Sequence, residues 1–303
     1  MIKDIAASVK ARLLNFSKMQ GRMFDEVLTM YMLERLLYRL SCSDYQKNFI
    51  LKGGLFLCVL FQEPYRTTKD IDLLGRQLAS KMDDIEDVFR KICKIAVDDG
   101  LVFLEESIHT LKIKEDADYE GVRVLIECRL GQSKKILQID IGFGDVIVPK
   151  AIRIDYPTIL EMEFPNILVY SVESVIAEKF DAMIKLSMLN SRMKDFYDVY
   201  MLTEKYNFEG RVLYEAIFET FQRRGTAYER NPDVFMEKFS QADDKRKQWI
   251  AFMRRTNSLY LTFEDVMNRI RYFLYPIFES LLQGNEFFLF WDKNKKEWEK
   301  KIK

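Results

Sequence analysis

Apolar residues recur every three or four positions over residues 1–43, which is the spacing that places them on one face of a helix. The pattern predicts two helices in this segment that meet at Gly21. The apolar run 47–52 predicts a short buried strand, and a Gly-Gly pair separates it from a helix that continues over 55–61.

The middle of the chain switches between strand-like and helical patterns. Alternating apolar residues predict a strand over 68–74, and a stripe of apolar residues at helical spacing predicts a helix over 81–99. Shorter extended pieces are expected as far as Tyr170. Between these segments, runs rich in valine, isoleucine and leucine predict three further strands, over 101–113, 121–130 and 134–143.

The pattern changes after Ser171, which is placed to cap a helix over 172–189. The basic tail 292–303 is expected to be a solvated helix end rather than a nucleic-acid patch. Further helices are expected over 192–206, 210–224, 233–253 and 262–282. We therefore expect an α+β fold. An α+β domain with N-terminal helices would occupy 1–170, and a mainly helical domain over 171–303 would pack against it and contribute to the active-site cleft.

Composition narrows the class of protein. Lys+Arg and Asp+Glu both number 47, so the formal charge is zero and no global field draws the chain to nucleic acid or membrane. The four cysteines form no C-x-x-C pair, and we expect reduced thiols rather than disulfides or zinc ligands. No apolar run approaches the length of a membrane span, so we expect a cytoplasmic protein without a membrane partner.

The chain has one histidine, His109, which lies in a strand-like run with no nucleophile signature nearby. Catalysis by a Ser-His-Asp or Cys-His set would need this residue in a different context. We expect His109 to be an ordinary strand residue. The chemistry would then depend on carboxylates, lysines and a metal ion.

Two aspartates, Asp70 and Asp72, flank Ile71 inside a predicted strand. Residues two apart on a strand point to the same face about 6.6 Å apart, so both carboxylates would lie side by side. Two neighbouring anions repel each other unless a cation lies between them, and carboxylate oxygens suit Mg²⁺ or Mn²⁺. Asp140 lies between isoleucines on another predicted buried strand and is our candidate third metal ligand. Three converging carboxylates can support in-line displacement at phosphorus, with Asp140 accepting the proton of the attacking hydroxyl.

The glycines Gly53 and Gly54 fit the same site. Without Cβ atoms the backbone can approach a phosphate closely, and the following helix presents free N–H groups at its positive end. Lys52 adds a positive charge. A Gly-Gly pair can also mark a tight turn, and an Asp-x-Asp pair is common on surfaces; their order along the chain favours a phosphate and metal site.

The helical half supplies further candidates. The stem of Lys179 can run along apolar surface while its ammonium group reaches a cleft. Asp195 and Asp198 are i and i+3 neighbours on one helical face, with Lys194 adjacent. An ordinary solvated face with Lys–Asp pairing explains these residues equally well.

The order KGG, RTTKDID, DIGFGD, AEKFDAMIKL and SRMKDFYD resembles the AbiEii/AbiGii toxin family of nucleotidyltransferases, distant relatives of the DNA polymerase beta superfamily. The resemblance implies a nucleotidyltransferase-like mixed sheet flanked by helices. It also implies the toxin half of a bacterial toxin–antitoxin pair linked to abortive phage infection, with a cognate antitoxin as partner. Family members with a known activity move a nucleotide from an NTP onto an acceptor, including the 3′ end of tRNA.

Carried over by position, the resemblance implies that Gly53 and Gly54 form the nucleotide-phosphate turn and that Asp70 and Asp72 hold the metal. Lys52 would add positive charge near the phosphates.

The resemblance also implies that Lys179 contacts the triphosphate and that Asp195 or Asp198 is the C-terminal catalytic aspartate. Arg66 would orient phosphate. The assignment of Asp140 as third carboxylate rests on its strand context and competes with Asp195. The family's usual Gly-Ser turn is Gly-Gly here, and the spacing from the glycines to the first aspartate is longer than in the polymerases.

Two other classes of function remain open. A metal-dependent glycosyltransferase or nuclease also uses an Asp-x-Asp pair, because any phosphate leaving group presents the same electrostatic problem. A non-catalytic protein could instead use its helical half to bind a partner, with the aspartates only capping or pairing.

Overall fold

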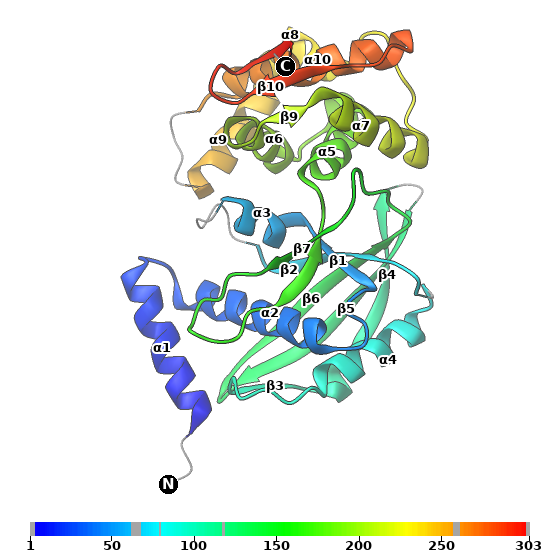
Figure 1. Cartoon of the computed structure of the whole chain (residues 1–303). Helices are drawn as coiled ribbons and strands as arrows, with labels where there is room; N and C mark the ends of the chain where they lie inside the picture. Colours follow the sequence, from blue (N-terminus) through cyan, green and yellow to red (C-terminus); the bar gives the residue numbers. More distant parts are fainter. Residues whose placement is uncertain (1–3, 62–67, 79, 117–118, 257–260, 301–303) are drawn as a thin grey trace. The chain divides into compact units, whose positions relative to one another are not determined.

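A computed structural model describes residues 4–61, 68–78, 80–116, 119–256 and 261–300. The chain divides into two compact units. Figure 1 colours the chain from blue at the N-terminus to red at the C-terminus. The first unit comprises Met1–Asp145 and Ala151–Tyr170, and the second comprises Val146–Lys150 and Ser171–Lys303. No helix in the described part of the chain combines the length and apolar character that crossing a bilayer needs.

The first unit is built on an eight-stranded mixed sheet with the order β3-β5-β6-β2-β1-β8-β7, with β4 also paired to β5. Strand β1, most of β2 and the second half of β6 are buried and rich in isoleucine and leucine, which suits strands covered on at least one face. Strand β2 runs parallel to β6 and antiparallel to β1. The strands are β1 (Phe49–Lys52), β2 (Asp70–Gly75), β3 (Leu101–Phe103), β4 (His109–Asp116), β5 (Tyr119–Leu130), β6 (Ser133–Phe143), β7 (Ile152–Asp155) and β8 (Asn166–Val169).

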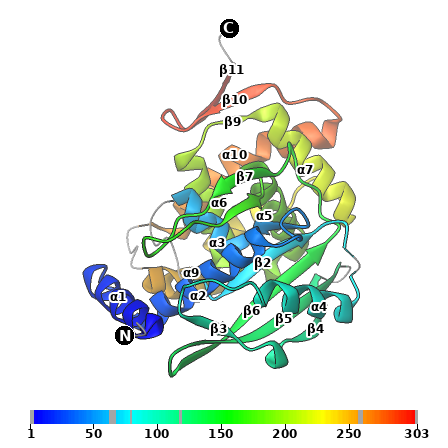
Figure 2. The same ribbon diagram turned by 60° about the horizontal axis from the view of Figure 1, so that its bottom comes forward.

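Helices α2 (Phe24–Cys42) and α4 (Met82–Cys93) pack on this sheet and contact each other, as Figures 1 and 2 show. Helix α1 (Ile5–Met19) lies beside α2, and α3 (Gly53–Phe61) follows β1 directly and contacts β2. The inner side of α2 carries a buried polar network in which Arg39 binds Asp99 through two hydrogen bonds of 2.6 and 3.1 Å.

Most of the first-unit pattern is confirmed. The two N-terminal helices meet at Gly21, whose φ of +62° is the left-handed conformation that glycine adopts without steric cost. The predicted helix 81–99 was too long, since α4 ends at Cys93 and a loop follows. The predicted strand 101–113 was wrong as a single element. A 3₁₀ turn at Glu105–Ser107 divides it into β3 and β4, which pair with different parts of β5.

The second unit is mainly helical and has an aromatic core. Buried rings including Phe180, Phe221 and Phe278 lie 5.4–5.8 Å apart in tilted and edge-on pairs. Ser171 caps the first helix as expected, accepting a hydrogen bond from the Ser174 N–H. The helices are α5 (Val172–Leu186), α6 (Met193–Lys205), α7 (Gly210–Arg224), α8 (Glu237–Gln241), α9 (Asp243–Thr256) and α10 (Phe263–Gln283).

Two second-unit predictions need correction. The single helix expected over 233–253 is instead a 3₁₀ turn, the short helix α8 and the longer helix α9, with a break at Ala242. The tail expected to be a helix end forms β10 (Leu289–Asp292) and β11 (Glu297–Lys300), which join β9 (Phe208–Glu209) in a small sheet. Trp298 decides this outcome, because its ring stacks on Phe273 at 5.3 Å and its Nε1 donates to the Phe273 carbonyl. The α+β fold predicted from the sequence pattern and the mixed sheet flanked by helices that the resemblance implies are both confirmed.

Candidate active site

Three carboxylates converge on the sheet of the first unit. The parallel pairing of β2 with β6 sets Asp72 directly opposite Asp140, and Asp70 lies two residues earlier on the same face of β2. Ile71, between the two aspartates, is buried in the core as expected. One ligand oxygen from each of Asp70, Asp72 and Asp140 lies within 4.8 Å of the others.

This donor set fits a divalent cation. Mg²⁺ and Mn²⁺ prefer carboxylate oxygens, and Mg²⁺ usually takes one or two carboxylates and keeps some water or phosphate oxygens as its other ligands. Asp70 and Asp72 are half-buried and Asp140 is buried, so the carboxylates are partly withdrawn from water. The structure thus brings together the three aspartates predicted as metal ligands; their roles stay predictions.

Gly53 forms one wall of this acidic cluster. Its φ is +67°, and a Cβ built on it would lie 1.8 Å from Oδ2 of Asp72. Any side chain at this position would displace that carboxylate. The first glycine of the KGG sequence is therefore required for two reasons: its backbone conformation and the close approach of Asp72. Gly54 is buried in the first turn of α3.

Asp70 is held by its neighbour Thr68. The Thr68 hydroxyl, which is buried, donates a 2.7 Å hydrogen bond to Oδ1 of Asp70. A hydrogen bond of this kind orients a metal ligand without coordinating the metal itself. We missed Thr68 from the sequence, although its place two residues before the Asp-x-Asp pair put it on the same strand face.

Asp140 carries a partner that the sequence did not reveal. The antiparallel pairing of β5 with β6 sets Arg123 opposite Asp140, and its guanidinium donates two hydrogen bonds of 2.8 Å, from Nε to Oδ1 and from Nη2 to Oδ2. Gln138 donates a third, of 3.0 Å, to Oδ2. The hydrogen bond to Asp140 and the charges of Asp70 and Asp72 raise the pKa of Arg123, so this side chain is a permanent cation at the edge of the acidic cluster.

Lys52 is also paired. It is buried, its Nζ lies 2.9 Å from Oδ2 of Asp145, and the ammonium lies 5.7 Å from the centre of the Tyr170 ring. The register of β1 with β2 places Lys52 opposite Asp72. Asp145 follows strand β6 and was not singled out from the sequence. The predicted phosphate contact of Lys52 stays a prediction, and its charge is shared with Asp145.

The second unit brings together the predicted residues of its first two helices. Lys179 on α5 lies 2.7 Å from Asp195 and 2.8 Å from Asp198, both in the first half of α6. Asp198 is fully buried and Asp195 nearly so. An ammonium between two buried carboxylates stabilises the contact of α5 with α6. The Lys–Asp pairing that the sequence left open is therefore present, but the two aspartates are buried and not on a solvated face. The triphosphate contact of Lys179 and the catalytic role of either aspartate stay predictions, and Arg66 lies outside the described residues.

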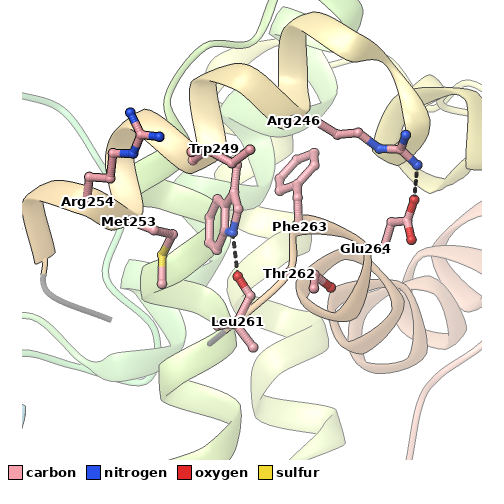
Figure 3. Close-up of a pocket in the computed structure, with 9 residues that line it drawn as sticks. Arg246, Trp249, Met253, Arg254, Leu261, Thr262, Phe263 and Glu264 are labelled. Atoms are coloured by element: carbon pink, nitrogen blue, oxygen red, sulfur yellow. Dashed lines mark hydrogen bonds and ion pairs between the residues drawn. The ribbon is translucent and has the colours of Figure 1, made fainter. Parts of the chain in front are cut away.

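The second unit also has a pocket of about 470 Å³ between α9 and the start of α10. Figure 3 shows the Trp249 indole donating to the Leu261 carbonyl and Arg246 paired with Glu264. The walls are largely apolar, and none of the predicted site residues in the described part of the chain lines it. Its lining residues are Arg246, Trp249, Ile250, Met253, Arg254, Leu261, Thr262, Phe263 and Glu264.

Comparison with known proteins places the chain in a family. A family model described as the nucleotidyl transferase AbiEii toxin of a type IV toxin–antitoxin system matches residues 35–269. A candidate nucleotidyltransferase from H. pylori, solved by crystallography, has a similar fold, with 15% identity, a TM-score of 0.50, and coverage of 87% of this chain and 99% of its own. JHP933 from Helicobacter pylori shares 14% sequence identity with this chain, with a TM-score of 0.46 and coverage of 86% of this chain and 94% of its own. No curated protein matches the chain in sequence. Because the family model spans well over half of its length, this protein belongs to the AbiEii nucleotidyltransferase toxin family.

Proposed function

We propose that this protein is a metal-dependent nucleotidyltransferase that moves an NMP from an NTP to an acceptor hydroxyl, and that it is the toxin of a toxin–antitoxin pair. Membership of the AbiEii family supports a toxin–antitoxin nucleotidyltransferase. The single observation that carries the chemistry is the acidic cluster Asp70, Asp72 and Asp140, with ligand oxygens within 4.8 Å of one another.

The residues of the first unit have separate tasks in this proposal. Asp70 and Asp72 hold Mg²⁺ or Mn²⁺, which when bound would neutralise the phosphate oxygens and the charge that develops at phosphorus. The backbone N–H groups at the start of α3, after Gly53, bind phosphate oxygens, because the first N–H groups of a helix have no partner within it. Gly53 permits this approach and leaves room for the Asp72 carboxylate.

Asp140 is the proposed proton acceptor. Each carboxylate oxygen has two lone pairs. Among the described residues Oδ2 receives two hydrogen bonds, from Arg123 and Gln138, while Oδ1 receives one, from Arg123. Oδ1 therefore keeps a lone pair for a metal ion or for the proton of the acceptor hydroxyl. As that hydroxyl oxygen bonds to the α-phosphorus, the bond from this phosphorus to the bridging oxygen breaks and pyrophosphate leaves.

The finer parts of the proposal rest on family membership. We propose an RNA acceptor such as the 3′ end of tRNA, a cognate antitoxin as protein partner, a role in defence against phage, and the cytoplasm as the site of action. Lys179 is proposed to contact the triphosphate, with Asp195 or Asp198 as a further catalytic carboxylate. The ion pairs between these residues keep them close together on α5 and α6.

The test is incubation of the protein with each α-³²P-labelled NTP, Mg²⁺ and total RNA, followed by separation of RNA, protein and small molecules. We expect label in RNA from the wild type and none from Asp70→Ala or Asp72→Ala. Asp87→Ala is a matched control, because Asp87 is a well exposed carboxylate on α4, with 68% of its side chain accessible. Transfer by either site variant at the wild-type rate would contradict the proposal. Label in the protein fraction instead of RNA would show that the acceptor is a protein and would contradict the RNA acceptor.

A further inference from the structure

The acidic cluster includes a cation of its own. Three carboxylates lie together on β2 and β6, and the guanidinium of Arg123 on β5 binds one of them, Asp140, through both of its oxygens. The pairing is set by the sheet, because the β5–β6 register that joins Leu130 to Ser133 at the turn also joins Arg123 to Asp140. The register therefore fixes the Cα of Arg123 beside that of Asp140, within reach of its carboxylate.

Geometry distinguishes this ion pair from the surface pairs of the molecule. Only a third of the Arg123 side chain and 12% of the Asp140 side chain are accessible. Two parallel N–H···O bonds to one carboxylate fix both the position and the plane of that carboxylate, which a lysine cannot do. Gln138 adds a hydrogen bond to Oδ2, so the Asp140 carboxylate is held by three donors before any ligand arrives.

We propose that Arg123 is a positioning residue that does two things at the site: it orients the third carboxylate, Asp140, and it weakens the binding of a divalent cation by supplying one of the positive charges that the cluster needs. The inference rests on the proposed function, since it assigns a role around the metal of that reaction. With Arg123 in place, three negative charges face one positive charge, and a divalent ion completes the balance. Without Arg123, the metal ion is the cation that balances the three negative charges, so the cluster attracts it more strongly.

The direction of the effect follows from charge. Arg123 repels a divalent cation through the partly buried interior of the site, where screening is weaker than in water. Removal of its charge therefore tightens metal binding, on the order of tenfold. The same removal takes away two of the three hydrogen bonds that orient Asp140 and leaves the one from Gln138, so transfer slows although the metal binds better. If the ion pair only stabilised the fold, its loss would not raise the affinity for the metal ion while lowering the rate of transfer.

The experiment is a titration of the full-length protein with Mn²⁺, followed by electron paramagnetic resonance of the free ion, for wild type, Arg123→Gln and Arg123→Lys. We expect Arg123→Gln to bind Mn²⁺ about tenfold more tightly, and Arg123→Lys to bind it like the wild type, with a lower kcat for both variants. Arg129→Gln is the matched control: Arg129 is on the same strand, half exposed and paired with Glu127. Six residues along a strand separate it from Arg123 by about 20 Å. At this distance physiological salt screens the repulsion between the Arg129 charge and a cation in the cluster.

The outcomes separate the inference from the proposed function. Equal Mn²⁺ affinity of wild type and Arg123→Gln would overturn the inference alone. Absence of Mn²⁺ binding in the wild type and in every variant would overturn the metal site and the inference together. A second measurement needs no neutral variant: in protein labelled with ¹⁵N-arginine, the Nε–H signal that is lost in Arg123→Lys should shift when Mg²⁺ is added. A signal that does not move would overturn the inference even if Arg123→Gln fails to fold.

Discussion

Gly53 offers the most demanding test of how the backbone builds the site. Substitution Gly53→Ala adds a single methyl group at the junction of β1 and α3. That methyl group would lie 1.8 Å from Oδ2 of Asp72, and also 2.5 Å from its Cγ. Either the carboxylate or the turn has to move.

The size of the effect follows from two separate terms. Ordinary van der Waals contact begins at 3.4 Å, so Oδ2 has to move by about 1.6 Å to accept the methyl group. A displacement of about 1 Å in a catalytic group can cost about 100-fold in rate. The positive φ adds a backbone cost of about 1–2 kcal/mol for any residue with a Cβ. We therefore expect kcat to fall by at least 100-fold, with a loss of stability of at least about 1–2 kcal/mol.

A matched control separates these two terms. Gly131, in the turn between β5 and β6, has a φ of +55° and nothing within 4 Å of the position that a Cβ would occupy. Gly131→Ala should lose about 1–2 kcal/mol of stability in urea denaturation, from the positive φ alone, and keep full Mn²⁺ affinity and transfer activity. Gly53→Ala should lose both affinity and activity. If Gly53→Ala retained wild-type Mn²⁺ affinity and rate, the close packing of this glycine against Asp72 would have no part in the site.

Three further predictions follow from single contacts. Thr68→Val removes the hydroxyl that orients Asp70 and should weaken Mn²⁺ binding about tenfold, while Thr68→Ser should restore it; unchanged affinity in the valine variant would exclude this role. Lys179→Met leaves the buried Asp198 without its ammonium partner and should cost about 3–5 kcal/mol of unfolding free energy in urea; a loss below 1 kcal/mol would contradict the buried ion pair. Burial raises the pKa of Glu34 from 4.5 to about 7, so its contribution to stability is present below pH 4.5 and is lost as the pH rises through 7. Glu34→Gln should therefore flatten the stability profile between these values, and an unchanged slope would refute the shift.

The parts of the fold that could be predicted are those in which local pattern and tertiary packing agree. Gly53 marks the end of β1 and the start of α3 because only glycine fits there. The isoleucines around Asp70, Asp72 and Asp140 identify buried strands, and this context alone was enough to place the three acids on one sheet. Ser171 caps α5 through a local hydrogen bond, so sequence reasoning locates that boundary well.

The errors arose where distant contacts overrule the local pattern. In the C-terminal tail, charged residues around Trp298 look like a solvated helix, but Trp298 stacks on Phe273 and draws the segment into a sheet. The two halves of the run 101–113 pair with different parts of β5, and this depends on strand register rather than on propensity.

Register also explains which site residues were missed. Arg123 lies among apolar residues on a strand, and its importance emerges only when its partner is known. A two-residue turn at Gly131 and Gln132 would have set Leu130 against Ser133 and, by counting back along both strands, Arg123 against Asp140. Asp145 offered no such signal, since it lies beyond the end of β6 and reaches Lys52 only through the fold.

The central claim is that the acidic cluster on β2 and β6 holds a divalent cation. The most direct measurement is an anomalous difference map from crystals of the protein soaked in Mn²⁺. The account predicts a peak about 2.2 Å from carboxylate oxygens of both Asp70 and Asp72. The peak should lie on the side that faces Oδ1 of Asp140, and it should be absent from crystals of Asp72→Asn. A map with no peak between these aspartates, at a Mn²⁺ concentration that supports nucleotide transfer in solution, would contradict it.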